Sequence, residues 1–532
     1  MMSNKNILEA IVKGNTSLGI ELGSTRIKSV LITSKNEEIA TGSFTWKNKF
    51  EDNYWTYSEQ DIWQGLQAAY QDLNNDVYVK YNVKLTKVGS IGISAMMHGY
   101  LAFDEAGKLL VPFRTWRNTN TKKAAEILSE QFNFNIPMRW SIAHLFQCIL
   151  CEEEHLNKIS FMTTLSGYVH WKLTGEKIVG IGEASGMFPI DFSKLNYDYK
   201  KVKIFNRISK KAGFNKDILE ILPNILLAGN IAGHLSERGR YLLDPTGNLE
   251  AGIPFCPPEG DAGTGMVSTN TLKANTGNIS AGTSIFSIIS LGKELSKPYK
   301  EIDIASSPDG SPIAMIHCNN GTSDFDSWVQ IIMELFDEFN INIDKSDVYS
   351  TLYSTIKNSD DDCGKIMNIN YVSGEHITNM PTGRPMVIRT SESNFTLSNL
   401  VCANIFSTLT TLRMGFDILT KEEEIVINEL LGHGGMFKAG EISQIIISSA
   451  LNTPLSVMET ASEGGAWGIA ILAAYCLNNS DETLEEFLNN KVFNLSQKSK
   501  VFPCNRTRIN FENFLKRYKN TLPIVSLAIE KL

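Results

Sequence analysis

One short stretch near the middle of the chain combines a carboxylate with flexible backbone. The sequence Glu-Gly-Asp-Ala-Gly-Thr-Gly runs from Glu259 to Gly265 and places Asp261 among three glycines. Glycine lets the backbone approach a ligand closely, and a carboxylate can accept the proton of a reacting hydroxyl group. Asp261 is therefore the first candidate for a catalytic residue, a general base. The alternative is an ordinary turn, of which Gly-Asp-Ala-Gly is equally typical.

Two segments about 260 residues apart share the plan of strand, small turn and strand. Residues 18–32 turn at 23–26, and residues 276–290 turn at 282–284. Backbone N–H groups and hydroxyls at such tips can donate to phosphate oxygens. The candidate nucleotide-binding residues at the two tips are Gly23, Ser24, Thr25 and Lys28, and Gly282 and Thr283. The repetition predicts two related halves that hold a nucleotide phosphate chain, although each tip alone is equally an ordinary hairpin.

Candidate substrate contacts follow a predicted buried strand at residues 88–95. This strand runs directly into Met96-Met97-His98-Gly99. Open α/β sheets bind ligands at the carboxyl ends of their strands, so His98 is expected to face a substrate. A buried structural histidine is the alternative. Trp116 and Asn118, in the polar segment 114–120, suit the ring faces and hydroxyl groups of a sugar.

A third glycine-rich turn is predicted in the second half of the chain. An apolar segment ends at Gly434-Gly435 and a helix is expected from about residue 440 to 451. Bare backbone at a helix start can lie against adenine or phosphate. A small-residue helix at 463–474 is expected to pack beneath this turn. The segment 182–191 is expected to be a loop without a catalytic group.

Two cysteines and a histidine raise the question of a metal or redox site. Cys148 and Cys151 form a C-x-x-C pattern with His155 close by. A structural zinc site needs a second pair of ligands, and the sequence offers none at the usual spacing. We favour two helix positions with apolar neighbours.

Composition bounds the class of protein. The chain has 532 residues, of which 42% are hydrophobic and 20% charged, so two or three domains with full-sized cores are expected. A net charge of −8 and the lack of a dense basic run argue against a nucleic-acid partner. No stretch is apolar enough for a spanning helix, and the first 15 residues do not resemble a signal peptide. We therefore expect a cytoplasmic enzyme of small-molecule chemistry without a membrane partner.

These motifs, in this order, resemble those of the FGGY carbohydrate kinases over residues 18–475, most of the chain. The resemblance implies an α/β, two-lobed fold of the actin and hexokinase type, a duplicated ribonuclease H-like architecture with the active site in the interlobe cleft. It implies a sugar-binding and phosphate-loop domain at 1–265, a nucleotide-binding domain at 266–480 and a tail at 481–532. Homodimers are common in similar kinases, so a homodimer is left open.

The resemblance also implies residue roles. Asp261 falls at the catalytic aspartate, residues 21–28 and 282–284 at the two phosphate loops, and Gly434, Gly435 and Ala439 at the adenosine motif. ATP is the implied phosphoryl donor, with Mg²⁺ near Glu21 and Asp261. Glu21 stands where most members of the family have Asp.

The sugar is less firmly implied than the family. Met97-His98-Gly99 is similar to the segment that lines the sugar site in the xylulokinase branch, whereas Met96 and Arg117-Asn118 depart from that branch. We expect ATP-dependent phosphorylation of a ketopentose, D-xylulose ahead of L-ribulose or another sugar or polyol. A nucleotide-switch ATPase of the same architecture, without sugar kinase activity, is the alternative from another class.

Overall fold

The computed structural model describes residues 3–458, 464–478, 481–494 and 498–532. The chain forms two compact units that alternate along the sequence. Unit 1 comprises Met1–Leu272, Ile304–Ile313 and Ala461–Leu495, and unit 2 comprises Lys273–Asp303, Ala314–Thr460 and Ser496–Leu532. The sequence predicted a sugar-binding domain up to residue 265, a nucleotide-binding domain up to residue 480 and a tail after it. This assignment of roles to segments stays a prediction.

A five-stranded sheet is the centre of unit 1, in the order β13-β6-β1-β2-β3. β1 pairs antiparallel with β2 and parallel with β6, and β13 continues the parallel part. The hairpin and the buried strand predicted from the sequence are therefore confirmed. The strands are β1 (Thr16–Leu22), β2 (Arg26–Thr33), β3 (Glu38–Thr45), β6 (Ser90–Ala95) and β13 (Glu259–Gly260).

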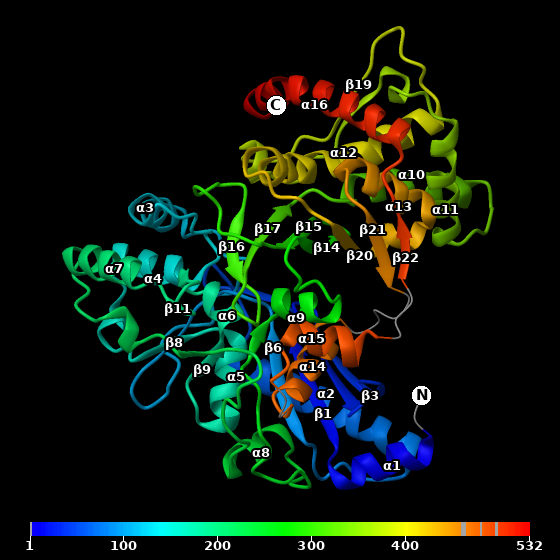
Figure 1. The fold of residues 1–532 in the computed structure, drawn as a ribbon. Coiled ribbons are helices and arrows are strands. Elements are labelled where there is room, and N and C mark those ends of the chain that lie inside the picture. Colours follow the sequence, from blue (N-terminus) through cyan, green and yellow to red (C-terminus); the bar gives the residue numbers. More distant parts are fainter. Residues whose placement is uncertain (1–2, 459–463, 479–480, 495–497) are drawn as a thin grey trace. The chain divides into compact units, whose positions relative to one another are not determined.

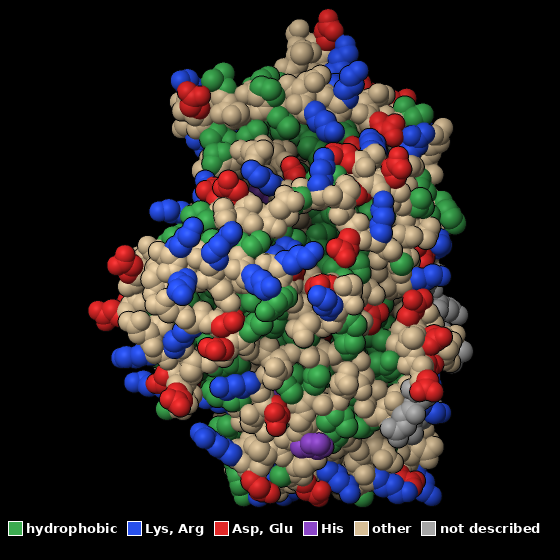
Figure 2. Space-filling model, turned by 60° about the vertical axis from the view of Figure 1, so that its left-hand side comes forward, with side chains coloured by type: hydrophobic (Ala, Val, Ile, Leu, Met, Phe, Trp, Pro, Cys, Tyr) green, Lys and Arg blue, Asp and Glu red, His purple; other side chains and the backbone are tan. Residues whose placement is uncertain are grey.

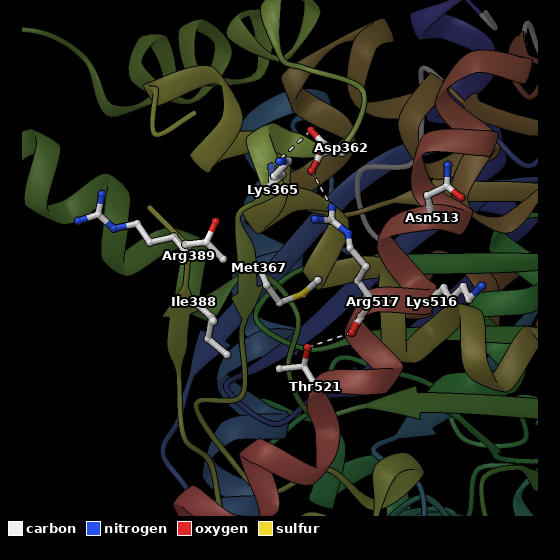
Figure 3. A pocket seen from close by; sticks show the side chains of 10 residues that line it. Asp362, Lys365, Met367, Ile388, Arg389, Asn513, Lys516, Arg517 and Thr521 are labelled. Atoms are coloured by element: carbon white, nitrogen blue, oxygen red, sulfur yellow. Dashed lines mark hydrogen bonds between the residues drawn. The ribbon is translucent and has the colours of Figure 1, made fainter. Parts of the chain in front are cut away.

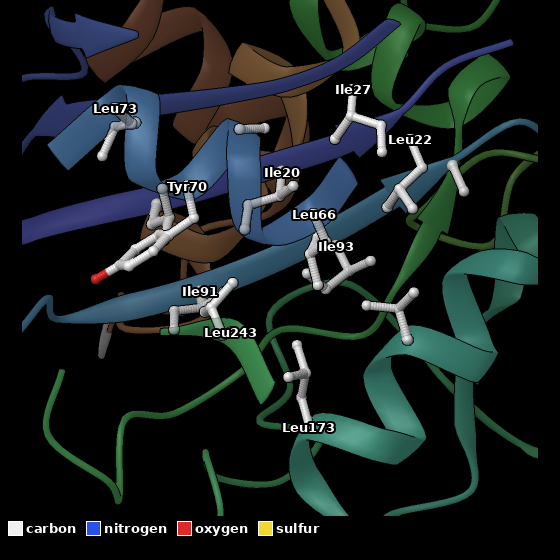
Figure 4. Packing of buried hydrophobic residues seen from close by; sticks show 14 of the residues in the cluster. Ile20, Leu22, Ile27, Leu66, Tyr70, Leu73, Ile91, Ile93, Leu173 and Leu243 are labelled. Atoms are coloured by element: carbon white, nitrogen blue, oxygen red, sulfur yellow. The ribbon is translucent and has the colours of Figure 1, made fainter. Parts of the chain in front are cut away.

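Helices cover this sheet because side chains on successive strand residues point to opposite faces. Ile20 and Leu22 of β1 join the hydrophobic core that Leu66 and Tyr70 of α2 (Glu59–Tyr81) help to form (Figure 4). Gly19, directly before Ile20 in β1, faces the other way, toward α14 (Gly464–Tyr475). A Cβ atom at Gly19 would lie 2.1 Å from the carbonyl oxygen of Ala466, so strand and helix backbones touch.

The position of α14 differs from the sequence prediction. We expected this small-residue helix to lie beneath the turn at 434–435, which belongs to unit 2. Instead α14 belongs to unit 1 and packs against β1, β6 and α9 (Asp261–Ser268), as Figure 1 shows for the orange helix beside the blue strand β1. The prediction was wrong because small residues indicate close packing without naming the partner.

A second hydrophobic cluster in unit 1 is mainly helical. It is built around Trp140, Phe146, Phe188 and Phe205, all buried. The remaining helices of unit 1 of five residues or more are α1 (Asn4–Lys13), α3 (Lys122–Phe132), α4 (Ser141–Leu150), α5 (Leu165–Thr174), α6 (Ile181–Ser185), α7 (Tyr199–Lys211) and α8 (Glu237–Leu243). The expected loop at 182–191 is thus partly wrong, because it begins inside α6.

Unit 2 repeats the plan of unit 1 around sheet strands in the order β17-β15-β14-β20-β21-β22. β14 pairs antiparallel with β15 and parallel with β20, as β1 does with β2 and β6. The second predicted hairpin is therefore confirmed. The strands are β14 (Thr276–Ala281), β15 (Ile285–Ser290), β17 (Pro312–Cys318), β20 (Glu429–His433), β21 (Leu455–Met458) and β22 (Lys498–Val501). β16 (Asp303–Ser306) falls mostly within Ile304–Ile313 of unit 1.

Helices of unit 2 include the last one in the chain. α16 packs its aromatic side chains into the unit, where Phe511 and Phe514 meet Phe406 of α12 edge to face, and Tyr518 meets Tyr371. The long helices are α10 (Ser323–Glu338), α11 (Lys345–Thr355), α12 (Leu397–Asp417), α13 (Glu441–Leu451) and α16 (Asn505–Lys531). The C-terminal segment is thus part of a hydrophobic core.

No helix in the described part of the chain is both long and apolar enough to span a bilayer. On the face drawn in Figure 2, Lys and Arg side chains are interspersed with Asp and Glu, and hydrophobic side chains lie scattered between them.

Candidate active site

The predicted site residues of unit 1 follow the carboxyl ends of three neighbouring parallel strands. Leu22 at the end of β1 pairs with Ala95 at the end of β6, and Ala95 pairs with Gly260 at the end of β13. Gly23, Met96 and Asp261 come directly after these strand ends. Asp261, Met97 and the first hairpin tip therefore lie at one edge of the sheet, the edge at which such sheets bind ligands.

Asp261 is the first residue of α9, which begins directly after β13. The segment is thus a strand end and a helix start rather than a turn. The Asp261 side chain is exposed, and its Oδ1 accepts a hydrogen bond from the backbone N–H of Met97 at 3.3 Å. Desolvation by the surrounding protein raises the pKa of Asp261, while hydrogen bonds from the backbone N–H groups of Met97 and Ala262 lower it. Asp261 therefore combines access to a ligand with a carboxylate fixed in place.

His98 is held in an uncommon backbone conformation. Its φ of 69° lies in the left-handed region, which residues other than glycine seldom adopt. The buried ring stacks on Trp140, with centroids 6.3 Å apart, and its Nδ1 lies 3.2 Å from the carbonyl oxygen of Gly186. Such strain persists only where surrounding packing enforces it, and it is common at ligand sites.

Two buried carboxyl groups beside Asp261 were missed in the sequence. Glu259 accepts hydrogen bonds from the backbone N–H groups of Gly182 and Glu183, at 3.3 and 2.9 Å. Burial raises the pKa of Glu259 to about 8 and that of Glu183 well above its usual range. Glu259 and Asp261 also raise the pKa of Glu183 by repulsion. Both groups therefore hold protons far more readily than an ordinary glutamate.

The signal for these two groups was present but weak. Glu183 lies in Gly-Glu-Ala-Ser-Gly, a carboxylate among small residues like the one around Asp261. A Cβ at Gly260 would lie 2.4 Å from Oε2 of Glu183. The glycine therefore allows the segment around Glu183 to contact the segment around Asp261.

The first hairpin tip is tied back through its carbonyl groups. Trp46 Nε1 donates to Gly23 O at 2.7 Å, Tyr57 Oη donates to Ser24 O at 2.5 Å, and Trp46 N donates to Thr25 O at 3.1 Å. Ser24 and Thr25 have exposed side chains. Carbonyl oxygens repel phosphate, and here they are turned toward donors of the protein. The hydroxyl and N–H groups of the tip are therefore the groups suited to bind an anion.

Glu21 and Lys28 lie opposite each other in the β1–β2 ladder. A Cβ at Gly465, at the start of α14, would lie 2.2 Å from Oε1 of Glu21, so the carboxylate rests against the first turn of that helix. Glu21 and Asp261 thus present carboxylate oxygens, the ligands that Mg²⁺ prefers, from strand ends at the same sheet edge. Both residues are therefore chemically suited to Mg²⁺, and a magnesium site shared by them stays a prediction.

Trp116 and Asn118, the two predicted sugar contacts after residue 114, differ in their exposure to solvent. Trp116 is exposed, whereas Asn118 is buried and its amide is used by the protein itself. Asn118 Oδ1 accepts from Trp55 N at 2.8 Å, and its Nδ2 donates to the carbonyl oxygens of Trp55 and Thr115. These bonds make Asn118 a support for the segment that carries Trp116. Whether either residue contacts a sugar stays a prediction.

In unit 2, the predicted nucleotide-binding residues meet at one end of two parallel strands. Ser280 of β14 pairs with His433 of β20, so Gly282 and Gly434 follow neighbouring strand ends. A Cβ at Gly434 would lie 2.6 Å from the carbonyl oxygen of Ala281. Gly435 and Ala439 follow in a 3₁₀ turn, Gly435–Ala439, ahead of α13. The second hairpin and the glycine turn thus form one continuous surface of backbone within unit 2.

The side chains of Cys148, Glu153 and His155 lie together, although a metal was not favoured there. Their potential ligand atoms lie within 4.8 Å of one another. The Arg114 guanidinium already fills this place, since it pairs with Glu153 at 2.5 Å and donates to Cys148 Sγ at 2.9 Å. A cation held in position by these partners leaves no need for a metal charge. Cys148 lies in α4 as expected, but its neighbours here are charged rather than apolar, and Cys151 follows the helix and is exposed.

A cavity of about 630 Å³ in unit 2 is separate from all predicted site residues. Lys365, Arg389, Lys516 and Arg517 give it a basic lining (Figure 3). However, Arg517 donates to the Asp362 carbonyl oxygen at 2.6 Å, and the Arg389 guanidinium points away from the other side chains. The positive charges therefore do not converge on one point as they would in a built anion site.

Comparison with known proteins identifies both halves of the sequence. The description "FGGY family of carbohydrate kinases, N-terminal domain" matches residues 16–267, and the corresponding C-terminal domain matches residues 277–477. A xylulose kinase of Haemophilus influenzae is 23% identical over 94% of this chain and 98% of its own length. A glycerol kinase of Thermococcus kodakarensis is 18% identical over 52% of this chain and 54% of its own.

Solved structures confirm the predicted fold. Ligand-bound xylulose kinase from Lactobacillus acidophilus superimposes with a TM-score of 0.79 over 97% of this chain and 99% of its own, at 16% identity. Gluconate kinase from the same organism gives a TM-score of 0.79, with 97% and 99% covered, at 15% identity. The fold is therefore the actin and hexokinase type that was expected, and relatives of this fold differ in the sugar or polyol they are named for.

Proposed function

The chain belongs to the FGGY family of carbohydrate kinases and is a sugar phosphotransferase; from this premise we propose that it converts D-xylulose to D-xylulose 5-phosphate with ATP. The observation that carries the proposal is the hydrogen bond between Met97 N–H and Asp261. It joins the base candidate to Met97-His98-Gly99, the segment similar to the sugar-binding segment of xylulokinases. The names of relatives such as the H. influenzae xylulose kinase support the same choice.

Asp261 is the proposed general base. It would accept the proton of the terminal hydroxyl as the oxygen approaches the γ-phosphorus in line. Its bond to Met97 fixes one oxygen and leaves the other for the substrate. The N-terminal position in α9 favours the negative charge that the base needs before the reaction.

The remaining predicted residues hold the donor. Hydroxyl and N–H groups of Ser24, Thr25 and Thr283 would donate to phosphate oxygens that gain charge in the transition state. Gly434 and Gly435 would offer bare backbone to the adenosine. A magnesium ion held by Glu21 and Asp261 would neutralise phosphate charge when bound. Most of the catalysis is then positioning and electrostatics, as is usual for phosphoryl transfer.

Two alternative functions must be distinguished from the proposed one. Gluconate and glycerol kinases occur among the relatives of similar fold or sequence, so another sugar or polyol is the nearest alternative. A nucleotide-switch ATPase without sugar kinase activity is the candidate from another class. Met97-His98-Gly99 has no use in the second candidate.

The deciding experiment is a coupled ADP-release assay with Mg-ATP against D-xylulose, L-ribulose, aldopentoses, glycerol and gluconate. The proposal expects a rate with D-xylulose that exceeds the no-sugar rate by roughly two orders of magnitude or more. A higher kcat/KM with another member of the panel would replace the substrate. Rapid ADP release that no sugar changes would instead support the switch protein.

A further inference from the structure

The second hairpin tip is held in place by a short segment between β17 and α10, residues 319–322. Gly321 N donates to Thr283 O at 2.9 Å, and Thr322 N donates to Gly282 O at 2.8 Å. The hydroxyl of Ser323 adds a bond to Thr283 O at 3.1 Å. Both tip carbonyls are thus turned toward residues 321–323, as the first tip is turned toward Trp46 and Tyr57.

The fit between tip and segment is too close for any side chain. A Cβ atom at Gly321 would lie 2.3 Å from the carbonyl oxygen of Gly282 and 2.8 Å from that of Thr283. These neighbours are backbone atoms, which cannot rotate away. A displacement of residues 319–322 is therefore passed directly to the hairpin tip.

A buried carboxylate holds this segment from its other side. Oε2 of Glu375 accepts from Asn319 N at 2.9 Å, Asn320 N at 3.3 Å and Asn320 Nδ2 at 3.1 Å. Oε1 of Glu375 lies 3.5 Å from Nδ1 of His376. Glu375 is completely buried, so a carboxylate there requires such partners. Its bonds link consecutive N–H groups of the segment to one charged atom.

Side-chain amides complete the support. Asn320 Oδ1 accepts from Ser373 N at 2.9 Å, and Asn319 Nδ2 donates to Gly374 O at 2.8 Å. Asn370 Nδ2 donates to the carbonyl oxygens of Asn320 and Gly321, at 3.1 and 3.3 Å. The segment is bonded along its whole length. Thr322 Oγ1 also donates to the half-buried Asp326 at 3.1 Å, and Glu375 is the buried carboxylate among the partners described.

We infer that Glu375 is a positioning residue for the nucleotide: through residues 319–322 it fixes the second hairpin tip in the conformation that donates to phosphate. The inference rests on the proposed function, because Gly282 and Thr283 are nucleotide contacts only there. Glu375 itself touches no substrate. Its loss should weaken the binding of ATP and leave the binding of the sugar unchanged.

The test compares Glu375→Gln with wild type in two ways. Hydrogen exchange of the peptide spanning residues 321–323 should be faster in the variant, because the N–H groups of Gly321 and Thr322 donate to the tip and these bonds weaken when the segment loosens. KM for ATP and Kd for a non-hydrolysable ATP analogue should rise roughly 10-fold, as expected when a hydrogen bond to a charged group is lost, with KM for the sugar unchanged. Glu392→Gln, which removes an exposed partner of Lys365 in the same unit, is the matched control and should change none of these values.

A second variant protects the test against misfolding of the first. Asn319 is exposed, and Asn319→Ala removes only its bond to Gly374 O. This variant should also raise KM for ATP and Kd for the ATP analogue, by a smaller factor than Glu375→Gln does. Unchanged exchange at 321–323 in a folded Glu375→Gln protein overturns the inference whatever the enzyme's substrate. Faster exchange with an unchanged Kd for the analogue shows that Glu375 holds the hairpin but that the hairpin does not bind nucleotide, which refutes both this inference and that part of the proposed function.

Discussion

At the scale of single residues, Asp261 is the group whose loss should affect chemistry without affecting structure. Asp261→Asn keeps the size and the acceptor for Met97 N–H but removes the base. We expect kcat to fall by at least about 10²-fold, the scale of general-base removal, with unchanged affinity for the ATP analogue measured without Mg²⁺. Steady-state kinetics and equilibrium binding measure the two quantities. Asp52→Asn, at an exposed turn residue, is the control, and near-normal kcat in Asp261→Asn would remove Asp261 from the mechanism.

The raised pKa of Glu259 predicts that the free energy of unfolding depends on pH. Its folded pKa of about 8 lies above its ordinary value of 4.5. Between these values the folded state binds more protons than the unfolded state, so the free energy of unfolding falls as pH rises through this window. Glu259→Gln removes this dependence. The variant should gain stability relative to wild type as pH rises, with a slope of at most about 1.4 kcal/mol per pH unit.

Urea unfolding followed by circular dichroism, at several pH values between about 5 and about 8, measures this difference. The exposed Glu51→Gln is the control and should follow wild type. A constant difference between Glu259→Gln and wild type across the window would show that Glu259 is ionised in the folded protein. Glu183, present in both proteins, contributes equally to the two curves.

At the scale of elements, the contact between β1 and α14 is set by the absence of a side chain. In Gly19→Ala the new methyl group would press on the backbone of Ala466 and Ala470, at 2.1 and 2.6 Å. We expect a loss of at least about 2 kcal/mol of stability, the scale of overpacking, and a lower Tm. Thermal unfolding checks this. Gly292→Ala, where the nearest atom to the new Cβ is 3.6 Å away, should be close to neutral. Equal Tm values for the two variants would show that the contact is less close than described.

At the scale of the whole molecule, the interleaving of the units predicts that the N-terminal half is incomplete by itself. A fragment of residues 1–272 lacks α14, so the face of β1 and β6 that this helix covers would be open to water. We expect the fragment to be mostly insoluble and, where soluble, to bind a hydrophobic dye and unfold without cooperativity. The full chain is the control. A soluble fragment with a sharp thermal transition would contradict this.

The same interleaving explains what the sequence could and could not predict. Both hairpins and the strand before Met97 were predictable, since alternating apolar residues and small turn residues are local signals. The partner of α14 and the grouping of Glu183 and Glu259 beside Asp261 were not, because they depend on contacts between segments distant in sequence. The choice of sugar depends on such contacts as well, and for that reason the motif at Met97 indicates a branch of the family rather than a substrate.

The close fit of Gly19 to α14 also has a consequence for protein synthesis. Gly19 leaves the ribosome early, whereas its packing partner Ala466 follows 447 residues later. At typical elongation rates this interval lasts roughly 20 to 90 s. Throughout that time one face of the nascent sheet has no covering helix, so we expect newly made chains to need chaperones or rapid translation of residues 19–466 to avoid aggregation.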